Sequence, residues 1–179
     1  MLQEGQIYEF SFLRLDIVRN TKLVRKYPRP LIIDTYSEIK SIVRKLVEKR
    51  NGRIWDWEGD GGFAAFHYED KNINAVLTGI EILYDLFIYN LFECKLKEGL
   101  AVRMAIHTGP CQFFKEAKVM QNETLKKLEI LESRYSKPNT LTLSPGVYTD
   151  MGQKLERAFE QVPIDGGNSV YRYTLQWED

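Results

Sequence analysis

Two isolated aspartates stand where carboxylates could hold a metal ion. Asp60 lies in the run 57–66 (WEGDGGFAAF), whose pattern predicts a strand, a tight Gly-Asp-Gly turn and a second strand. Asp16 ends an apolar run from Tyr8 that also predicts a strand. Carboxylate oxygens suit Mg²⁺ and Mn²⁺, and a pair of carboxylates can hold such ions against the phosphates of a nucleotide. The alternative is that each aspartate only caps its own turn, which aspartate does well.

The predicted elements would bring the two aspartates together. Hydrophobic periodicity and turn residues predict strands at 7–16, 53–58, 62–67 and 100–107 and helices at 36–49 and 72–92. Their order, β-α-β-β-α-β, is that of a ferredoxin-like fold, an antiparallel sheet with helices on one face. In this order the end of the first strand lies beside the turn of the middle hairpin, so we expect Asp16 and Asp60 to converge.

The rest of the chain predicts additions to this core. A turn is expected at Thr108-Gly109-Pro110, after which 111–114 should pair back as a strand. A helix at 122–135, a short strand at 141–143, a turn or short helix from Ser144 and closing strands at 158–163 and 169–176 should follow. No repeat or interdomain linker is visible. We therefore expect one α+β domain, 1–179, with a ferredoxin-like core and C-terminal strands.

Composition limits the class of protein. The chain has 179 residues, 44% of them hydrophobic and 28% charged, as in a soluble globular domain. Lys+Arg and Asp+Glu both number 25, so no global charge favours nucleic acid. A local basic stretch follows Asp16, and it is either a solvated helix face or a field that attracts polyphosphate. Its members are Arg19, Lys22, Arg25, Lys26 and Arg29.

Cysteine usage and hydropathy suggest a cytoplasmic protein. The two cysteines, Cys94 and Cys111, form neither a zinc pattern nor a disulfide framework, and no signal peptide is visible. The segment 73–92 is apolar, but Glu81 and Asp85 interrupt it. We expect a helix buried on more than one side rather than a membrane span.

Several segments, taken in order, resemble the catalytic domain of class III nucleotidyl cyclases, over roughly 10–148. Leu15-Asp16-Ile17-Val18 followed by Thr21 is similar to the family's first metal segment, and 52–66 is similar to its Gly-Asp-Gly hairpin. Val102–Gly109 is similar to its Arg-x-Gly-Ile-His-x-Gly strand, with Ala105 in place of glycine. The closing segment is similar at Leu131-Glu132-Ser133, Lys137-Pro138-Asn139 and Leu143-Ser144 followed by Val147-Tyr148.

The resemblance implies an intramolecular phosphoryl transfer. Two Mg²⁺ or Mn²⁺ ions would be bound by Asp16, the carbonyl of Ile17, and Asp60, and the ribose 3′-hydroxyl of a nucleoside triphosphate would displace pyrophosphate. Backbone N–H groups at the start of a helix would hold the phosphates; these belong to Val18, Arg19, Asn20 and Thr21. The family builds its active sites at a homodimer interface, so the resemblance implies a homodimer with shared sites.

The base-reading position departs from the family pattern. Where the family keeps a purine-reading lysine, an ungapped alignment of the hairpin places Asp56. A carboxylate reverses the hydrogen-bonding character offered to the base. Trp55 and Trp57 flank Asp56, and we expect them on opposite faces of the strand. One could stack on the base while the other packs in the core, or both could be plain packing.

The family's transition-state pair, Asn-x-x-x-Arg, is also missing. Anchoring on Leu131-Glu132-Ser133 places Lys126 and Ile130 at these positions, and sliding by one turn places Glu123 and Lys127 there. Lys126 or Lys127 could supply the missing cation, without the bidentate fork of arginine, or both could lie on a solvated face. Arg103 could be structural or face the phosphates, whereas His107 is expected to be a satisfied strand residue.

Three interpretations follow. The first is an active cyclase with a changed base, similar to the pyrimidine cyclases of bacterial antiphage signalling, which make cyclic UMP or cyclic CMP. The second is a purine cyclase with unusual side chains. The third is a non-catalytic nucleotide-binding or dimerisation module.

Overall fold

The computed structural model describes residues 2–116 and 122–175. Its elements are β1 (Ile7–Ile17), α1 (Asn20–Lys26), α2 (Arg29–Lys49), β2 (Arg53–Glu58), β3 (Gly61–Phe66), α3 (Lys71–Phe92), β4 (Val102–Gln112), α4 (Glu123–Ile130), the π-helical turn η2 (Leu131–Tyr135), β5 (Thr140–Leu143), α5 (Pro145–Asp150), α6 (Gln153–Glu156), β6 (Glu160–Pro163), the 3₁₀ turn η3 (Asp165–Gly167) and β7 (Ser169–Thr174).

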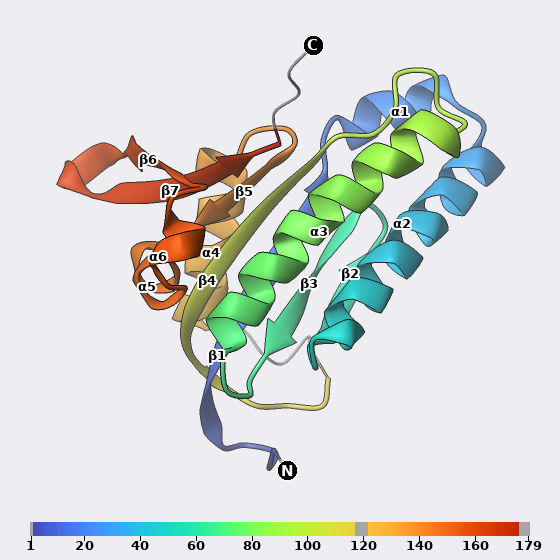
Figure 1. Ribbon diagram of the computed structural model, residues 1–179. Coiled ribbons are helices and arrows are strands. Elements are labelled where there is room, and N and C mark those ends of the chain that lie inside the picture. The colour runs from blue at the N-terminus through green and yellow to red at the C-terminus, as the bar shows by residue number, and fades with distance from the viewer. Residues whose placement is uncertain (1, 117–121, 176–179) are drawn as a thin grey trace.

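The strands form one sheet in the order β2-β3-β1-β4-β5-β7-β6 (Figure 1). Its first four strands pair antiparallel, with β1 between β3 and β4. This confirms the expected ferredoxin-like core. β5 then pairs parallel to β4, and β7 and β6 extend the sheet antiparallel, so the C-terminal strands lengthen one edge of the core.

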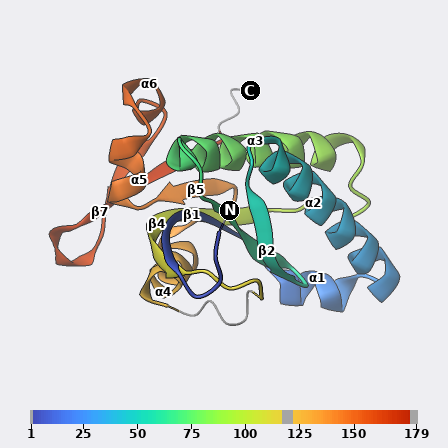
Figure 2. The ribbon, with the colours of Figure 1, turned by 90° about the horizontal axis from the view of Figure 1, so that it is seen from below.

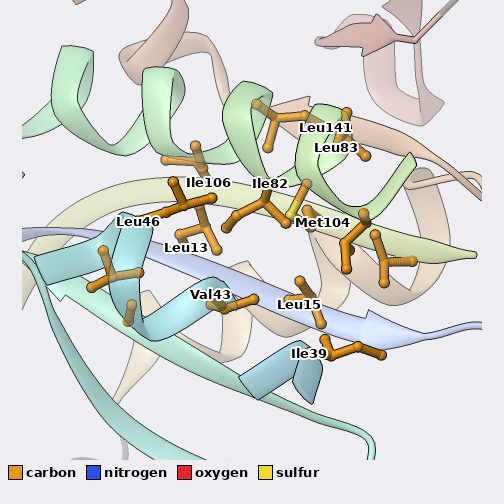
Figure 3. Close-up of a cluster of buried hydrophobic side chains, with 14 of the residues drawn as sticks. Leu13, Leu15, Ile39, Val43, Leu46, Ile82, Leu83, Met104, Ile106 and Leu141 are labelled. Carbon is orange, nitrogen blue, oxygen red and sulfur yellow. The ribbon is translucent and has the colours of Figure 1, made fainter. Parts of the chain in front are cut away.

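The larger hydrophobic core lies between the sheet and helices α2 and α3 (Figure 3). Alternate residues of β1 point into it, because side chains of a strand project to opposite faces in turn; Leu13 and Leu15 are 1% exposed. Ile39 and Val43 of α2 and Ile82 of α3 meet them at helical spacing. We call this side of the sheet the α3 face.

A second core covers the opposite side, which we call the α4 face (Figure 2). The other residues of β1, Phe10 and Phe12, are fully buried there against Leu128 of α4 and Leu131 of η2. The expectation of helices on one face only is therefore wrong. Because Phe10 and Phe12 on one side of β1 and Leu13 and Leu15 on the other are large and apolar, both sides of the sheet had to be covered.

The expected turn at Thr108-Gly109-Pro110 is also wrong, because β4 runs straight through it and pairs with β1 as far as Gln112. Pro110 carbonyl accepts bonds from Thr124 Oγ1 (2.7 Å) and Asn122 Nδ2 (3.1 Å). The nitrogen and carbonyl of a strand residue face the same side, so the Pro110 nitrogen faces α4, and its missing hydrogen costs no bond to β1. Residues 111–114 therefore do not pair back on β4.

α3 differs from its expected burial. By length and apolar composition alone it could cross a membrane, but 44% of its most apolar window is buried inside the protein, as in a core helix. The apolar residues of α3 that do not face the sheet or α2 are not covered by other elements. It forms an exposed stripe of Tyr84, Ile88, Leu91 and Phe92, the last 77% exposed.

An ion-pair cluster joins the end of α2 to α3 and yields a test of the fold. Glu81 accepts bonds from Arg50 Nη1 (2.7 Å) and Lys49 Nζ (3.2 Å), and Arg50, followed by Lys49, lowers the pKa of Glu81 from 4.5 to about 2. Because Glu81 is about one-third exposed, we expect Glu81→Gln to lower the free energy of unfolding at pH 7 by about 1 kcal/mol or less.

The pH dependence gives the sign of this prediction. A carboxylate with a lowered folded pKa stabilises the fold above its unfolded pKa, and this contribution is lost as pH falls toward the folded pKa. The difference between wild type and Glu81→Gln in urea unfolding should therefore be full above about pH 5 and shrink between pH 4.5 and pH 2. Glu48→Gln, an exposed change on α2, is the control. A difference that stays constant over this range would contradict the assignment.

Candidate metal and nucleotide site

The end of β1 and the turn of the β2–β3 hairpin meet, as expected. Asp16 pairs with Gly61 in the β1–β3 register, and the Ile17 N–H donates to the carbonyl of Asp60 over 3.0 Å. The expected convergence of Asp16 and Asp60 is confirmed. Both carboxylates are partly exposed, so an ion could reach them from solvent.

Glycines around Asp60 make this approach possible. Gly59 has a φ of 55°, which a residue with a side chain adopts at a cost. A Cβ on Gly61 would lie 2.4 Å from the Leu15 carbonyl oxygen, so only glycine lets β3 come this close to β1 there. The Gly-Asp-Gly pattern thus reflects both turn geometry and backbone contact.

The carbonyl of Ile17 is directed to the same place. Because the N–H of Ile17 donates to Asp60, its carbonyl also faces the hairpin side of β1. This fits the ligand role that the resemblance implies. The Val18 N–H, in contrast, donates to Ala101 O (2.8 Å) and is not available to a phosphate.

The other N–H groups of the expected phosphate segment remain open. Within the described residues, those of Arg19, Asn20 and Thr21 have no backbone acceptor, as is usual at the start of a helix. Arg19 precedes α1 with a left-handed φ of 63°. Three of the four predicted N–H groups could therefore contact an anion.

Asp16 is held by Arg103 of the neighbouring strand β4. Arg103 Nη2 and Nε lie 2.8 Å and 3.1 Å from the same oxygen, Asp16 Oδ2. Arg103 thus faces Asp16, and of its two expected roles the structural one is visible. Within the described part of the chain Asp16 Oδ1 has no hydrogen-bond partner, so one oxygen remains for a metal ion.

A buried glutamate completes this network on the α4 face. Glu132 of η2 is 3% exposed, and it contacts Arg103 Nε and, over 3.2 Å, Arg14 Nε. The Nε hydrogen of Arg103 is directed to Asp16, and Glu132 Oε1 has no hydrogen-bond donor among the residues that the structure describes. Burial raises the pKa of Glu132, whereas Arg103 opposes this rise. The sequence shows Glu132 only as the middle residue of the Leu131-Glu132-Ser133 segment. Its ion pairs cannot be predicted from that segment, because they depend on contacts between distant elements.

Two groups of the site, Asp16 on β1 and Tyr36 on α2, have raised pKa values. Burial raises the pKa of Asp16, Arg103 opposes the rise, and the charge of Asp60 adds to it. Tyr36 of α2 lies close to both carboxylates: burial, followed by the charges of Asp60 and Asp16, raises its pKa to about 12. Its hydroxyl donates to Asn20 Oδ1 over 2.7 Å. Sequence reasoning missed Tyr36, which shows only as one residue of a helical pattern.

The predicted base-reading residues divide between the two faces. Trp55 packs on the α4 face, where its ring is T-shaped to Phe10 (5.5 Å between centroids) and its Nε1 donates to Phe114 O (3.3 Å). Trp57 packs on the α3 face. The opposite orientation of the tryptophans is confirmed. Because positions i and i+2 of a regular strand share a face, it depends on the register shift between Ile54 and Asp56.

Asp56 lies between them at an irregularity of the hairpin. The register shifts between Ile54 and Asp56, so that Asp56 pairs with Phe63. Phe63, with Arg14 on β1 and Lys126 on α4, lines a cleft of about 300 Å³. Asp56 therefore stands on the strand next to this cleft.

The α4 cations point to solvent. Lys126 is 67% exposed and bonds Glu123 one turn earlier, Nζ to Oε1, over 2.9 Å. Ile130, at the position of the family's arginine, is 44% exposed. Lys127 is exposed as well; burial, followed by the charge of Lys127, lowers the pKa of His107. His107 lies 2.9 Å from Ser144 Oγ through Nδ1, as a satisfied strand residue would.

The oxygen atoms of Asp16, Asp60 and Ile17 supply part of the coordination that a hard divalent cation needs. Two carboxylates and the Ile17 carbonyl are oxygen ligands of the kind that Mg²⁺ and Mn²⁺ prefer. No group of three or more His, Cys, Asp or Glu side chains that could hold an ion occurs among the described residues. A metal ion bound here would complete its coordination with water or ligand phosphates, which is usual for Mg²⁺.

Comparison with known proteins identifies the fold. No protein-family description and no curated protein matches the sequence. Among solved structures, the guanylyl cyclase domain of the RhoGC fusion protein from the aquatic fungus Blastocladiella emersonii is similar, with a TM-score of 0.79 at 15% identity, over 96% of this chain and 98% of that chain.

Two further structures are similar over nearly their whole length. The adenylyl cyclase CyaB from P. aeruginosa gives a TM-score of 0.75 at 18% identity, over 99% of this chain and 98% of that one. The catalytic core of a rhodopsin-guanylyl cyclase with converted specificity, in complex with ATPαS, gives 0.80 at 16%, over 98% and 100%. The fold is that of the class III cyclase catalytic domain, as the resemblance implied.

The Glu132 network predicts an asymmetry between two glutamates of the same helical segment. Removing one partner of a buried ion pair leaves uncompensated charge, so Glu132→Gln should lower the free energy of unfolding by about 3 kcal/mol. Glu123→Gln removes an exposed pair of the same segment and should cost much less, because solvent screens such a pair. Urea unfolding followed by circular dichroism measures both. Equal effects would show that Arg103 and Arg14 do not depend on Glu132.

Proposed function

We propose that this chain is a metal-dependent nucleotidyl cyclase that converts a nucleoside triphosphate to a 3′,5′-cyclic nucleotide and pyrophosphate. The observation that carries the proposal is the convergence of Asp16 and Asp60 at one end of the sheet, in a fold shared with cyclase catalytic domains. Either feature alone is compatible with a structural role. Together they support a metal-dependent cyclisation at this end of the sheet.

The residues of the site would divide the work as follows. Asp16, Asp60 and the Ile17 carbonyl would bind two Mg²⁺ or Mn²⁺ ions, which supply charge neutralisation and lower the pKa of an oxygen bound to them. The open N–H groups of Arg19, Asn20 and Thr21 would orient the phosphates. The ribose 3′-hydroxyl would release its proton to water and its oxygen would bond to the α-phosphorus. The bond from that phosphorus to the oxygen bridging to the β-phosphorus would break, so that pyrophosphate leaves with that electron pair.

We propose a pyrimidine, UTP or CTP, as the base-specific substrate. Asp56 supports this, because a carboxylate accepts hydrogen bonds from the N3–H of uracil or the amino group of cytosine, where a lysine would donate. Trp55 is engaged in the packing of the α4 face, and Trp57 borders a groove beside Asp60; neither is required as a base platform. A cyclase core with converted specificity has this fold, so the fold tolerates changes of base preference.

Two alternatives rest on particular observations. A purine cyclase is favoured by the guanylyl and adenylyl cyclases among the similar structures. A nucleotide-binding or dimerisation module without activity is favoured by α4, where Lys126 is paired with Glu123 and Ile130 stands at the position of the family's arginine. The ion pair of Arg103 with Asp16 is also compatible with a site that binds no metal ion, because the guanidinium already neutralises the carboxylate.

Product analysis distinguishes these functions. The protein is incubated with each of the four nucleoside triphosphates and Mn²⁺, and products are identified by mass spectrometry. We expect cyclic UMP or cyclic CMP, with a rate that falls by about 100-fold or more in Asp60→Ala and is unchanged in Asp34→Ala, an exposed aspartate of α2. A cyclic purine would overturn the base assignment alone. Thermal stabilisation by nucleotides without any product would overturn catalysis and favour the module.

We further propose a homodimer with shared sites, in which each subunit contributes metal ligands to one site and an α4 cation to the other. The exposure of Lys126 and Lys127 supports this, because within one chain they point to solvent. Asp60→Ala and the double variant Lys126→Ala/Lys127→Ala should each be inactive. Their mixture should recover about a quarter of wild-type activity, since half the dimers are mixed and each holds one intact site of two. A mixture as inactive as its components would contradict shared sites.

The cellular setting is proposed from the resemblance to pyrimidine cyclases. We propose that the chain acts in the bacterial cytoplasm and that its product is a second messenger in antiphage defence. Phage plating on cells that carry the system with wild-type protein or with Asp60→Ala tests this role. Equal plating on both would contradict it without affecting the cyclase assignment.

A further inference from the structure

A separate basic cavity lies between α1 and the connection from α3 to β4. Its volume is about 620 Å³, which is within the range of small-molecule sites. Its walls come from α1, from 97–101 and from the loop before β5. It includes neither Asp16 nor Asp60, and it shares only Val18 and Arg19 with the candidate metal site.

The charge of this cavity is strongly one-sided. Four cations line it, from Arg19, Lys22, Lys26 and Lys97, against a single carboxylate, Glu98. Glu98 is already neutralised, because Lys26 Nζ lies 2.9 Å from its Oε2 and the Tyr27 hydroxyl also donates to it. The side chains of the other three cations have no ion-pair or hydrogen-bond partner among the residues that the structure describes.

This concentration of charge is exceptional in a neutral chain. The whole sequence carries 25 cations and 25 anions, yet no acidic residue occurs between Asp16 and Asp34, while that stretch holds five cations. Like charges that converge without counter-ions repel one another, and a bound anion removes that repulsion. The sequence pattern left open whether this stretch was only a solvated face; the cavity places part of it around a concave surface.

The floor of the cavity is apolar and ordered. We use the word floor for the apolar part of its lining, which consists of Leu23 and Leu100, each 5% exposed, and Phe87. Asn90 fixes the strand entering β4, with Nδ2 donating to Leu100 O (2.7 Å) and Oδ1 accepting from Leu100 N (2.8 Å). A ligand here would meet a rigid apolar base and a cationic rim.

We propose that this cavity binds a small molecule that carries a polyphosphate, of nucleotide size, without a divalent metal ion. The cationic rim would contact the phosphates through charge-assisted hydrogen bonds, and the apolar floor would accept the less polar part of the ligand. The binding does not depend on the proposed cyclase activity.

The test measures binding of ATP and of inorganic tripolyphosphate by isothermal titration calorimetry in EDTA, with the full chain. We expect the wild type and Asp16→Asn/Asp60→Asn to bind equally, and Lys22→Glu/Lys97→Glu to bind about tenfold or more weakly. The neutral variant Lys22→Gln/Lys97→Gln keeps the test valid if the charge-reversed protein does not fold. Arg44→Glu/Lys45→Glu, two exposed cations of α2, makes the same change of net charge and should bind as the wild type.

Four results would overturn the proposal. These are no binding to the wild type at millimolar probe, unchanged binding in both Lys22/Lys97 variants, an equal loss in Arg44→Glu/Lys45→Glu, and loss of binding in Asp16→Asn/Asp60→Asn. The third would indicate only general electrostatic attraction, and the last would place the probe at the metal site. Tighter binding of ATP than of tripolyphosphate would show that the apolar floor contributes.

Discussion

The close backbone contact between β1 and the tip of the β2–β3 hairpin is the constraint on which the site depends. The bond from the Ile17 N–H to the Asp60 carbonyl and the pairing of Asp16 with Gly61 bring together carboxylates from distant segments. This contact is possible only because Gly61 has no side chain to strike the Leu15 carbonyl. The two cores on either side of β1 hold the strand in this position, since a slip of one residue would exchange its buried faces.

Electrostatics then decides the resting state of the site. Two partly buried carboxylates at one strand end repel each other, and burial adds to the cost of charging Asp16. Arg103 compensates by binding one oxygen of Asp16, and Glu132 in turn compensates Arg103. The arrangement keeps Asp16 in place before an ion arrives. Under the proposed function a metal ion would bind beside a guanidinium, so metal affinity would depend on how far Arg103 remains bound to Asp16.

The sequence was sufficient for the parts of the fold that local patterns encode. Alternating residues and the glycine-rich turn predicted β1, the hairpin and the convergence of Asp16 with Asp60, because strand order follows from a simple β-α-β-β-α-β succession. It was insufficient where a distant contact overrides a local signal. Pro110 continues β4 because its carbonyl accepts a hydrogen bond from Thr124 of α4 and its nitrogen is not needed for pairing with β1. Tyr36 and Glu132 join the site only through packing between elements that are remote in sequence.

The central claim, that Asp16 and Asp60 form a metal site, is tested most directly by anomalous diffraction. Crystals grown with saturating Mn²⁺ and a non-hydrolysable analogue of UTP would be measured at the manganese absorption edge. The account predicts anomalous peaks within coordination distance of both carboxylates and of the Ile17 carbonyl, with Arg103 still beside Asp16. Peaks absent from both carboxylates, with nucleotide bound elsewhere or not at all, would contradict it.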